Sequence, residues 1–162
     1  MPDMNILVMG IGNILLQDEG AGVRAVEEFA RRYETPASVE LLDGGTSGIE
    51  LLQHIQGRSA LVLIDVVRNG EPYGTLSRFE GDAVPSLFQN KISPHQLGLS
   101  DLLATARLLG SMPEKVILYG IEPKTIETGL EMSAEIAGNI GRLTDLIADE
   151  IRSLGVTVTS RQ

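Results

Sequence analysis

The stretch that most constrains the fold runs from Asn5 to Glu19 and reads NILVMGIGNILLQDE. Its first part, Ile6–Met9, is an uninterrupted apolar run, which is typical of a parallel strand buried on both faces. Gly10 and Gly12 then allow the backbone to turn tightly at the carboxyl end of that strand. Two adjacent acids close the stretch just before a helical pattern begins. The sequence therefore predicts a strand, a glycine turn and a helix, with carboxylates beside the turn.

These carboxylates argue against a nucleotide-binding turn. Such a turn has a third glycine, so that phosphate can reach backbone amides at the start of the helix. Here that position is Leu15, and the charge of Glu19 would repel a phosphate. We expect Asp18 to be the N-cap of the helix, because an acid there is stabilised by the helix dipole. Glu19 is then the better candidate for binding a cation.

The rest of the chain alternates strands with helices. Helices are predicted over 20–33, 47–56, 85–88, 100–109 and 133–154, with Ser47, Ser100 and Ser133 as capping residues. Strands are predicted over 39–42, 59–67, 74–79, 115–121 and 156–158, the third and the last at sheet edges, and 91–98 is predicted as a loop. This alternation is typical of an α/β domain whose mainly parallel sheet is covered by helices on both faces, giving three layers. We expect one domain over 1–158 and a frayed tail over 159–162.

Composition excludes several kinds of site. The 162 residues include no cysteine, so disulfides, thiolate metal sites and cysteine nucleophiles are absent. A formal net charge of -9 disfavours nucleic acid and anionic membranes as partners. No secretion signal is visible at the N-terminus and no apolar run reaches membrane-spanning length, so we expect a cytoplasmic protein.

Three acids fall after successive predicted strands, where an open α/β sheet binds its ligands. They are Glu19, Asp43 and Asp65. Asp65 directly follows the apolar run 61–64, and an unpaired buried charge there would be very costly. It is therefore either a ligand or a residue that caps a turn at the end of the strand, and both interpretations fit the sequence equally well.

The chain has two histidines. His54 lies among apolar residues of a predicted helix, so we expect a packed or surface histidine. His95 lies between Pro94 and Gln96 in the predicted loop, where packing does not explain it, and loops on rigid scaffolds often carry function. Two carboxylates and one imidazole would suit nickel, zinc or manganese.

Asp43 begins the sequence DGGT, which admits three interpretations. It could contact a nucleotide sugar, form a tight turn before the next helix, or hold an extended peptide through its backbone. No serine elbow of the G-x-S-x-G type is present, so a hydrolase of this sequence would use water as the nucleophile.

Taken together, these motifs resemble the endopeptidases that mature nickel-iron hydrogenases. The similarity runs along nearly the whole chain in the same order: GIGNILLQDEGAGV over 10–23, DGGT over 43–46, Asp65 at the close of a strand, and SPHQLG over 93–98. Each motif alone is modest, but the combination is highly specific.

The resemblance implies a twisted, five-stranded, mainly parallel sheet between helices. It also implies an endopeptidase that removes the C-terminal extension of the hydrogenase large-subunit precursor after nickel insertion. Glu19, Asp65 and His95 match the family's nickel ligands, and Asp43 matches an acid that assists substrate binding or cleavage. Nickel would arrive with the substrate, so no organic cofactor is expected, and we expect a monomer. The catalytic candidates are Asp43, Glu19 and Asp65.

Two other classes of protein remain as alternatives. A dinucleotide- or phosphate-binding module would be retained on a nucleotide resin, although Leu15 and Glu19 disfavour it. A conventional metallopeptidase would keep its own metal, cleave generic peptides and lose activity to chelators. The absence of an H-E-x-x-H motif makes this second alternative a minor one.

Overall fold

The computed structural model describes residues 4–88 and 94–162, the side chains of Pro94, His95 and Leu97 excepted. Its centre is a five-stranded sheet in the order β3-β1-β4-β6-β5. The strands are β1 (Ile6–Ile11), β3 (Val39–Gly45), β4 (Ala60–Val66), β6 (Lys115–Ile121) and β5 (Leu76–Glu80). The first four are parallel, and β5 runs antiparallel to β6 at the edge. The predicted mainly parallel, five-stranded sheet is confirmed.

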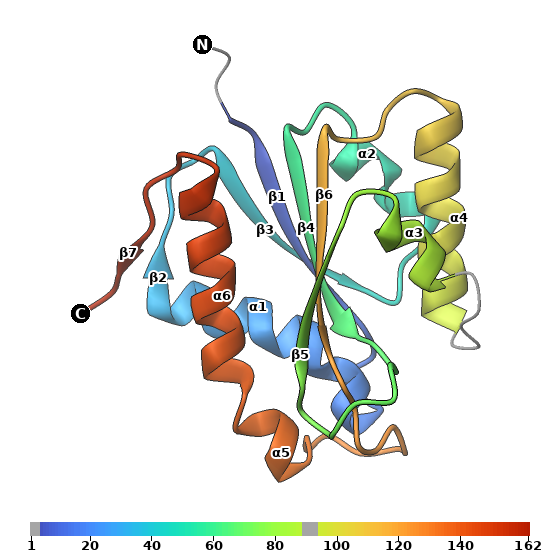
Figure 1. Cartoon of the computed structure of the whole chain (residues 1–162), viewed down its shortest axis with the longest axis vertical. Helices are drawn as coiled ribbons and strands as arrows, with labels where there is room; N and C mark the ends of the chain where they lie inside the picture. Colours follow the sequence, from blue (N-terminus) through green and yellow to red (C-terminus); the bar gives the residue numbers. More distant parts are fainter. Residues whose placement is uncertain (1–3, 89–93) are drawn as a thin grey trace.

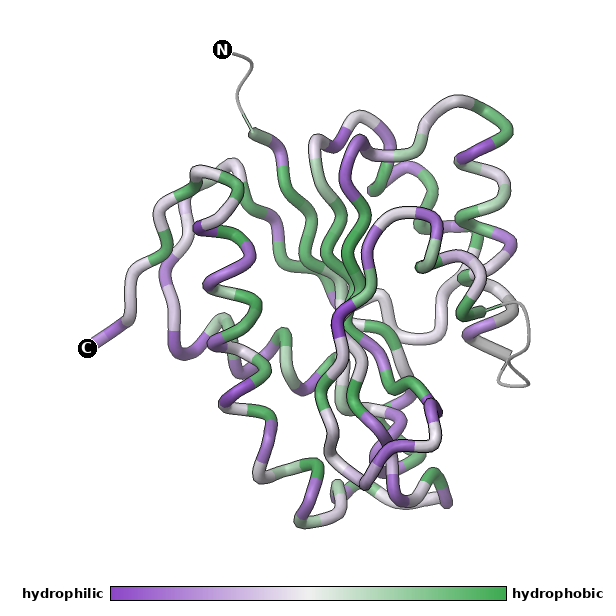
Figure 2. The backbone as a smooth tube through the Cα atoms, in the orientation of Figure 1, coloured by the Kyte–Doolittle hydropathy of each residue, from purple (hydrophilic) through white to green (hydrophobic). Residues whose placement is uncertain are grey.

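Helices cover both faces of this sheet (Figure 1). One face carries α1 (Ala21–Arg32) and α6 (Ile140–Ser153), and the other carries η2 (Ile49–Leu51), α2 (Leu52–Ile55), α3 (Ala83–Phe88) and α4 (Pro94–Leu108). Successive side chains of a strand point to opposite faces, so Ile6 and Val8 join one buried cluster while Leu7 and Met9 join the other. This is why the strands read as unbroken apolar runs, seen as the green centre of Figure 2.

The order of the strands reverses between β1 and β4. From β1 the chain passes through α1 to β3, and from β3 it returns across β1 to β4. Ligands of open α/β sheets bind outside the carboxyl ends of the strands at such a reversal. In this fold that point lies beside the residues that follow β1 and those that end β4.

Two predicted helix starts are wrong. The region 47–56 forms only the short η2 and α2, and the Ser47–Glu50 capping box does not form, since the Glu50 carboxylate accepts a hydrogen bond from the Gly48 amide at 2.9 Å. Helix α4 begins at Pro94, so the loop predicted over 91–98 is wrong from that residue onward and Ser100 lies inside the helix. Proline suits the first helical position because its missing N–H would have no partner there.

The C-terminal region also differs from the prediction. The last helix is split into α5 (Ala134–Ala137) and α6, and no strand forms over 156–158. Instead β7 (Thr159–Ser160) pairs antiparallel with β2 (Tyr33–Glu34), and the Arg161 amide donates to the carbonyl of Arg32 at 2.8 Å. The expectation of a frayed tail from residue 159 is therefore wrong, because these bonds tie the tail to the end of α1.

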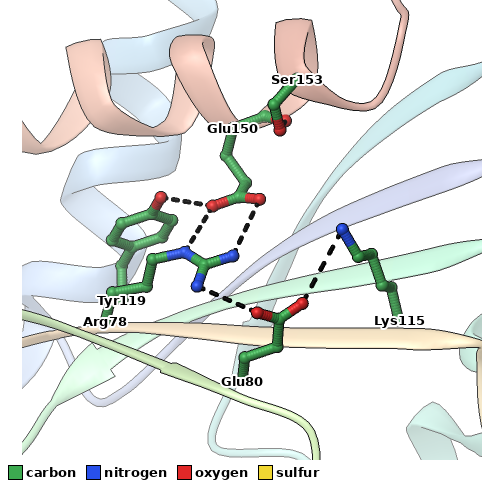
Figure 3. A network of polar contacts seen from close by, with 6 residues as sticks. All are labelled: Arg78, Glu80, Lys115, Tyr119, Glu150 and Ser153. Atoms are coloured by element: carbon green, nitrogen blue, oxygen red, sulfur yellow. Dashed lines mark hydrogen bonds and ion pairs between the residues drawn. The ribbon is translucent and has the colours of Figure 1, made fainter.

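A network of charged side chains joins the edge strand β5 to α6 (Figure 3). Arg78 on β5 donates to both carboxylate oxygens of Glu150 at 2.7 and 3.1 Å, and the hydroxyl of Tyr119 donates to the same carboxylate at 2.6 Å. Burial alone would raise the pKa of Glu150, but the hydrogen bonds from Arg78 and Tyr119 outweigh it and leave the pKa below its ordinary value. Glu150 is thus a buried anion with its partners in place.

No helix in the described part of the chain is long and apolar enough to cross a membrane.

Candidate functional site

Glycines bring the start of α1 against the ends of β1 and β4. Gly12 has φ +134°, and a Cβ atom on it would lie 1.8 Å from the carbonyl oxygen of Glu19. A Cβ atom on Gly22 would lie 2.1 Å from the carbonyl oxygen of Ile64. No side chain fits at either position, so the backbones touch. This close approach holds the short helix η1 (Gln17–Gly20) over the end of the sheet.

Two of the predicted site residues, Glu19 and Asp65, are buried at this edge. Their exposed fractions are 5% and 0%. Asp65 is the penultimate residue of β4, directly after Ile64, and η1 packs against the same strand. One oxygen of Asp65 accepts a hydrogen bond from the Val66 amide at 2.8 Å, and the other faces the Gln96 amide nitrogen at 3.5 Å. Asp65 is therefore held rigidly inside the strand end.

Asp43 lies at the same edge of the sheet but is exposed. It belongs to β3, which extends to Gly45 and so replaces the turn expected after residue 42. Asp43 is in register with Gly10 of β1, which is in turn in register with Ile64 of β4. One strand therefore separates Asp43 from Asp65. An exposed carboxylate at this edge of the sheet is accessible to a bound substrate and to water.

His95 lies in the first turn of α4, and its side chain is outside the described residues. Its neighbour Gln96 donates to the Val66 carbonyl at 3.3 Å as well as facing Asp65. The backbone of His95 is thus brought to the carboxyl end of β4. Among the described side chains, no group of three His, Cys, Asp or Glu residues could hold a metal ion, so the set Glu19, Asp65 and His95 stays a prediction.

The structure also places two residues that were not predicted to belong to the site, His54 and Gln96. His54 is half-buried on α2, as expected for a packed histidine. Gln96 was not among the predicted site residues, although its amide is a side-chain donor that the structure places at Asp65. The only sequence signal for it was its place next to His95 in the loop motif.

Asp18 is not the N-cap of α1, contrary to the prediction. Its side chain is fully buried and accepts hydrogen bonds from the amides of Lys124, Thr125 and Ser133 at 2.7–2.9 Å, and from the Ser133 hydroxyl at 2.8 Å. Burial alone would raise the pKa of Asp18, but these hydrogen bonds outweigh it and lower the pKa. Asp18 therefore anchors the connection between β6 and α5, and no local pattern reveals partners more than a hundred residues away.

The site can supply two kinds of chemistry. The buried carboxylates of Glu19 and Asp65 present oxygen donors of a type that divalent metals accept. The exposed carboxylate of Asp43 can exchange a proton with water. No cysteine is available to form a covalent intermediate. The described part of the site thus offers carboxylate oxygens at the edge of the sheet and no thiol nucleophile.

Known proteins share this fold and sequence. Residues 23–150 match the family model of the hydrogenase maturation proteases. The chain is 41% identical to the hydrogenase 2 maturation protease of Escherichia coli K12 over 160 residues, covering 98% of both proteins. It is 40% identical to the hydrogenase expression/formation protein HupD of Bradyrhizobium diazoefficiens, covering 98% of this chain and 84% of the relative.

Solved structures agree with the sequence relatives. The hydrogenase maturating endopeptidase HybD from E. coli superposes with a TM-score of 0.94 at 42% identity, covering 98% of both chains. The [NiFe] hydrogenase maturation protease HybD from Thermococcus kodakarensis superposes with a TM-score of 0.71 at 27% identity, covering 91% of this chain and 99% of that one. On the sequence match, the shared length and the fold, this chain belongs to the hydrogenase maturation protease family.

Proposed function

We propose that this protein is the endopeptidase that removes the C-terminal extension of a nickel-iron hydrogenase large-subunit precursor after nickel has been inserted. The observation that carries the proposal is the convergence of Glu19, Asp65 and the first turn of α4 at the carboxyl edge of the sheet. Membership of the hydrogenase maturation proteases supplies the class of substrate. The chain has no cysteine and so needs no oxidising compartment, which supports the proposal that it acts in the cytoplasm. We further propose that it acts as a monomer.

Nickel enters this proposal as part of the substrate. Glu19, Asp65 and His95 would bind a metal that the precursor already holds, since carboxylate and imidazole donors suit nickel. A precursor without the metal offers these three residues nothing to bind. Metal occupancy of the substrate would thereby decide whether the scissile bond is brought to the site.

The cleavage step that we propose uses water. Asp43 is the exposed carboxylate of the three acids, so it is the one placed to accept a proton as water attacks the peptide carbonyl. The same proton would then pass to the leaving amine as the carbon–nitrogen bond breaks. Glu19 and Asp65 are buried, and their role in the proposal is to position the substrate through its metal.

We call Glu19, Asp65 and His95 the metal-reading residues, and variants of two of them test this proposal. Glu19→Gln and His95→Ala should fold normally, fail to bind nickel-loaded precursor and leave it uncleaved, while Asp43→Asn should still bind it but cleave slowly. His54→Ala is the matched control, because it removes the other histidine of the chain. Binding would be measured by pull-down and cleavage by mass spectrometry. Wild-type rates in folded Glu19→Gln and His95→Ala would contradict the metal-reading role.

A further inference from the structure

Exposed apolar side chains gather beside the candidate site. Four of the eight large apolar side chains that are exposed in the described residues come from two short segments, 14–17 and 125–130. They are Ile14, Leu15, Ile126 and Leu130, with exposed fractions of 36, 56, 38 and 64%. We call these four side chains the apolar rim. Apolar groups that cluster on a surface are a common mark of an interaction site.

The two segments of the apolar rim are joined by backbone hydrogen bonds. The Gly129 amide donates to the Leu15 carbonyl at 2.8 Å, and the Gln17 amide donates to the Gly129 carbonyl at 3.0 Å, which makes Leu16 and Gly129 a parallel bridge. The Asp18 amide adds a bond to the Thr125 carbonyl at 3.1 Å. The rim is therefore a preformed surface, although its halves are more than a hundred residues apart in the sequence.

The backbone beside the rim is strained. Gln17 has φ +51°, the one positive φ of a non-glycine residue in the described chain. Its side chain accepts a hydrogen bond from the Thr125 hydroxyl at 2.8 Å, and the following residue, Asp18, is anchored by four hydrogen bonds. Such strain persists where the surroundings fix it, and it gathers at functional sites. Here Gln17 lies between Leu15 of the apolar rim and Glu19, so the hydrogen bonds that hold Gln17 and Asp18 also hold the apolar rim next to Glu19.

Charged side chains beside the apolar rim indicate what kind of partner this surface fits. Glu127 and Glu131 are exposed next to Ile126 and Leu130, and neither has an ion-pair partner among the described residues. The molecule as a whole carries a net charge of -9. Exposed acids beside apolar side chains attract a segment that combines apolar with basic side chains.

We propose that the apolar rim docks a segment of the large-subunit precursor in which apolar side chains are flanked by basic ones. This inference rests on the proposed function and adds a second contact, outside the metal-reading residues, to substrate recognition. The rim adjoins Glu19 through the chain itself, so a segment bound there lies beside the edge where the scissile bond is placed. Docking at the rim would hold the precursor before and during cleavage.

The double substitution Leu15→Ser/Leu130→Ser tests this docking surface. It should raise the KM for nickel-loaded precursor about tenfold or more and leave kcat within about twofold, because it removes apolar contacts made by both the bound and the reacting substrate. The matched control is Leu108→Ser/Leu109→Ser, which alters two exposed leucines of the α4 end, 87 and 60% exposed. The control should leave KM unchanged.

A second pair of substitutions tests the charge on the rim. Glu127→Gln/Glu131→Gln should raise KM at low salt and weaken its dependence on ionic strength. Equal KM values for Leu15→Ser/Leu130→Ser and for its control Leu108→Ser/Leu109→Ser, with normal cleavage by the wild type, would overturn the docking inference alone. No cleavage of loaded precursor by the wild type would overturn the proposed function, and the docking inference with it.

Discussion

At the scale of single residues, two adjacent acids have different roles. Asp18 is fully buried and saturated by four hydrogen bonds from the connection between β6 and α5, whereas Glu19 lies at the edge of the sheet where the candidate site is formed. An acid that is already satisfied by backbone amides is poorly suited to bind a ligand. Because Glu19 directly follows Asp18 in the chain, the hydrogen bonds of Asp18 also hold the backbone of Glu19 in place.

We expect Asp18→Asn to destabilise the fold. The amide would turn an N–H group toward backbone donors, leaving buried groups without partners, at a cost of about 2–4 kcal/mol in the free energy of unfolding. Urea denaturation would measure this cost. Glu127→Gln is the control, since Glu127 is exposed, and it should lie within about 0.5 kcal/mol of the wild type. Equal stability of the two variants would contradict the anchoring role.

The same residue should shape the acid unfolding of the protein. The pKa of Asp18 is lowered in the folded state, as is that of Glu150, so the unfolded chain binds protons more readily than the native one. The stability that these groups contribute is present above their ordinary pKa values, near 4, and is lost as pH falls below them. Asp18→Asn should flatten the loss of stability below pH 4. A slope identical to that of the wild type would argue against a lowered pKa.

At the scale of secondary-structure elements, glycine decides how α1 meets the sheet. The backbone of α1 at Gly22 touches the carbonyl of Ile64, and that of η1 at Glu19 touches Gly12. These contacts set where Glu19 lies relative to Asp65. The position of the candidate site thus depends on residues that carry no functional group.

Gly22→Ala should therefore damage both stability and activity. Its new Cβ atom would lie 2.1 Å from the Ile64 carbonyl oxygen, so α1 must shift, at a cost of about 3 kcal/mol or more. Gly141→Ala is the matched control on α6, where the nearest atom to the new Cβ, on Arg32, is 3.7 Å away. Thermal unfolding would compare the two. A Gly22→Ala protein as stable as Gly141→Ala would contradict this packing.

The elements that sequence predicts well are those whose burial is uniform. Strands β1, β4 and β6 are buried along almost their whole length and appear in the sequence as apolar runs. The start of α4 at Pro94 and the role of Asp18 were not predictable in this way. Proline suits the first position of a helix but also breaks helices, so Pro94 alone did not decide between a helix and a loop. The role of Asp18 depends on contacts with a distant part of the chain, such as Ser133. Local patterns carry no record of such contacts.

At the scale of the whole molecule, topology explains why the candidate residues meet. Glu19, Asp43 and Asp65 lie 22 to 46 positions apart in sequence, yet parallel strands deliver all three to one edge of the sheet. The reversal of strand order between β1 and β4 lets α1 cover one face and α4 the other, so that η1 and the first turn of α4 approach the end of β4. Because each of these acids follows a predicted strand in the sequence, their meeting at this edge could be predicted. The side chain of His95 lies outside the described residues, so its part in the site stays a prediction.

The most direct test is cleavage of large-subunit precursor by the purified protein, with the precursor once nickel-loaded and once nickel-free. The products would be identified by mass. We expect the C-terminal extension to be removed from the loaded precursor only, because Glu19, Asp65 and His95 have a metal to bind only there. Equal cleavage of both forms would contradict metal reading while leaving a protease. Failure to cleave either form would contradict the proposed function.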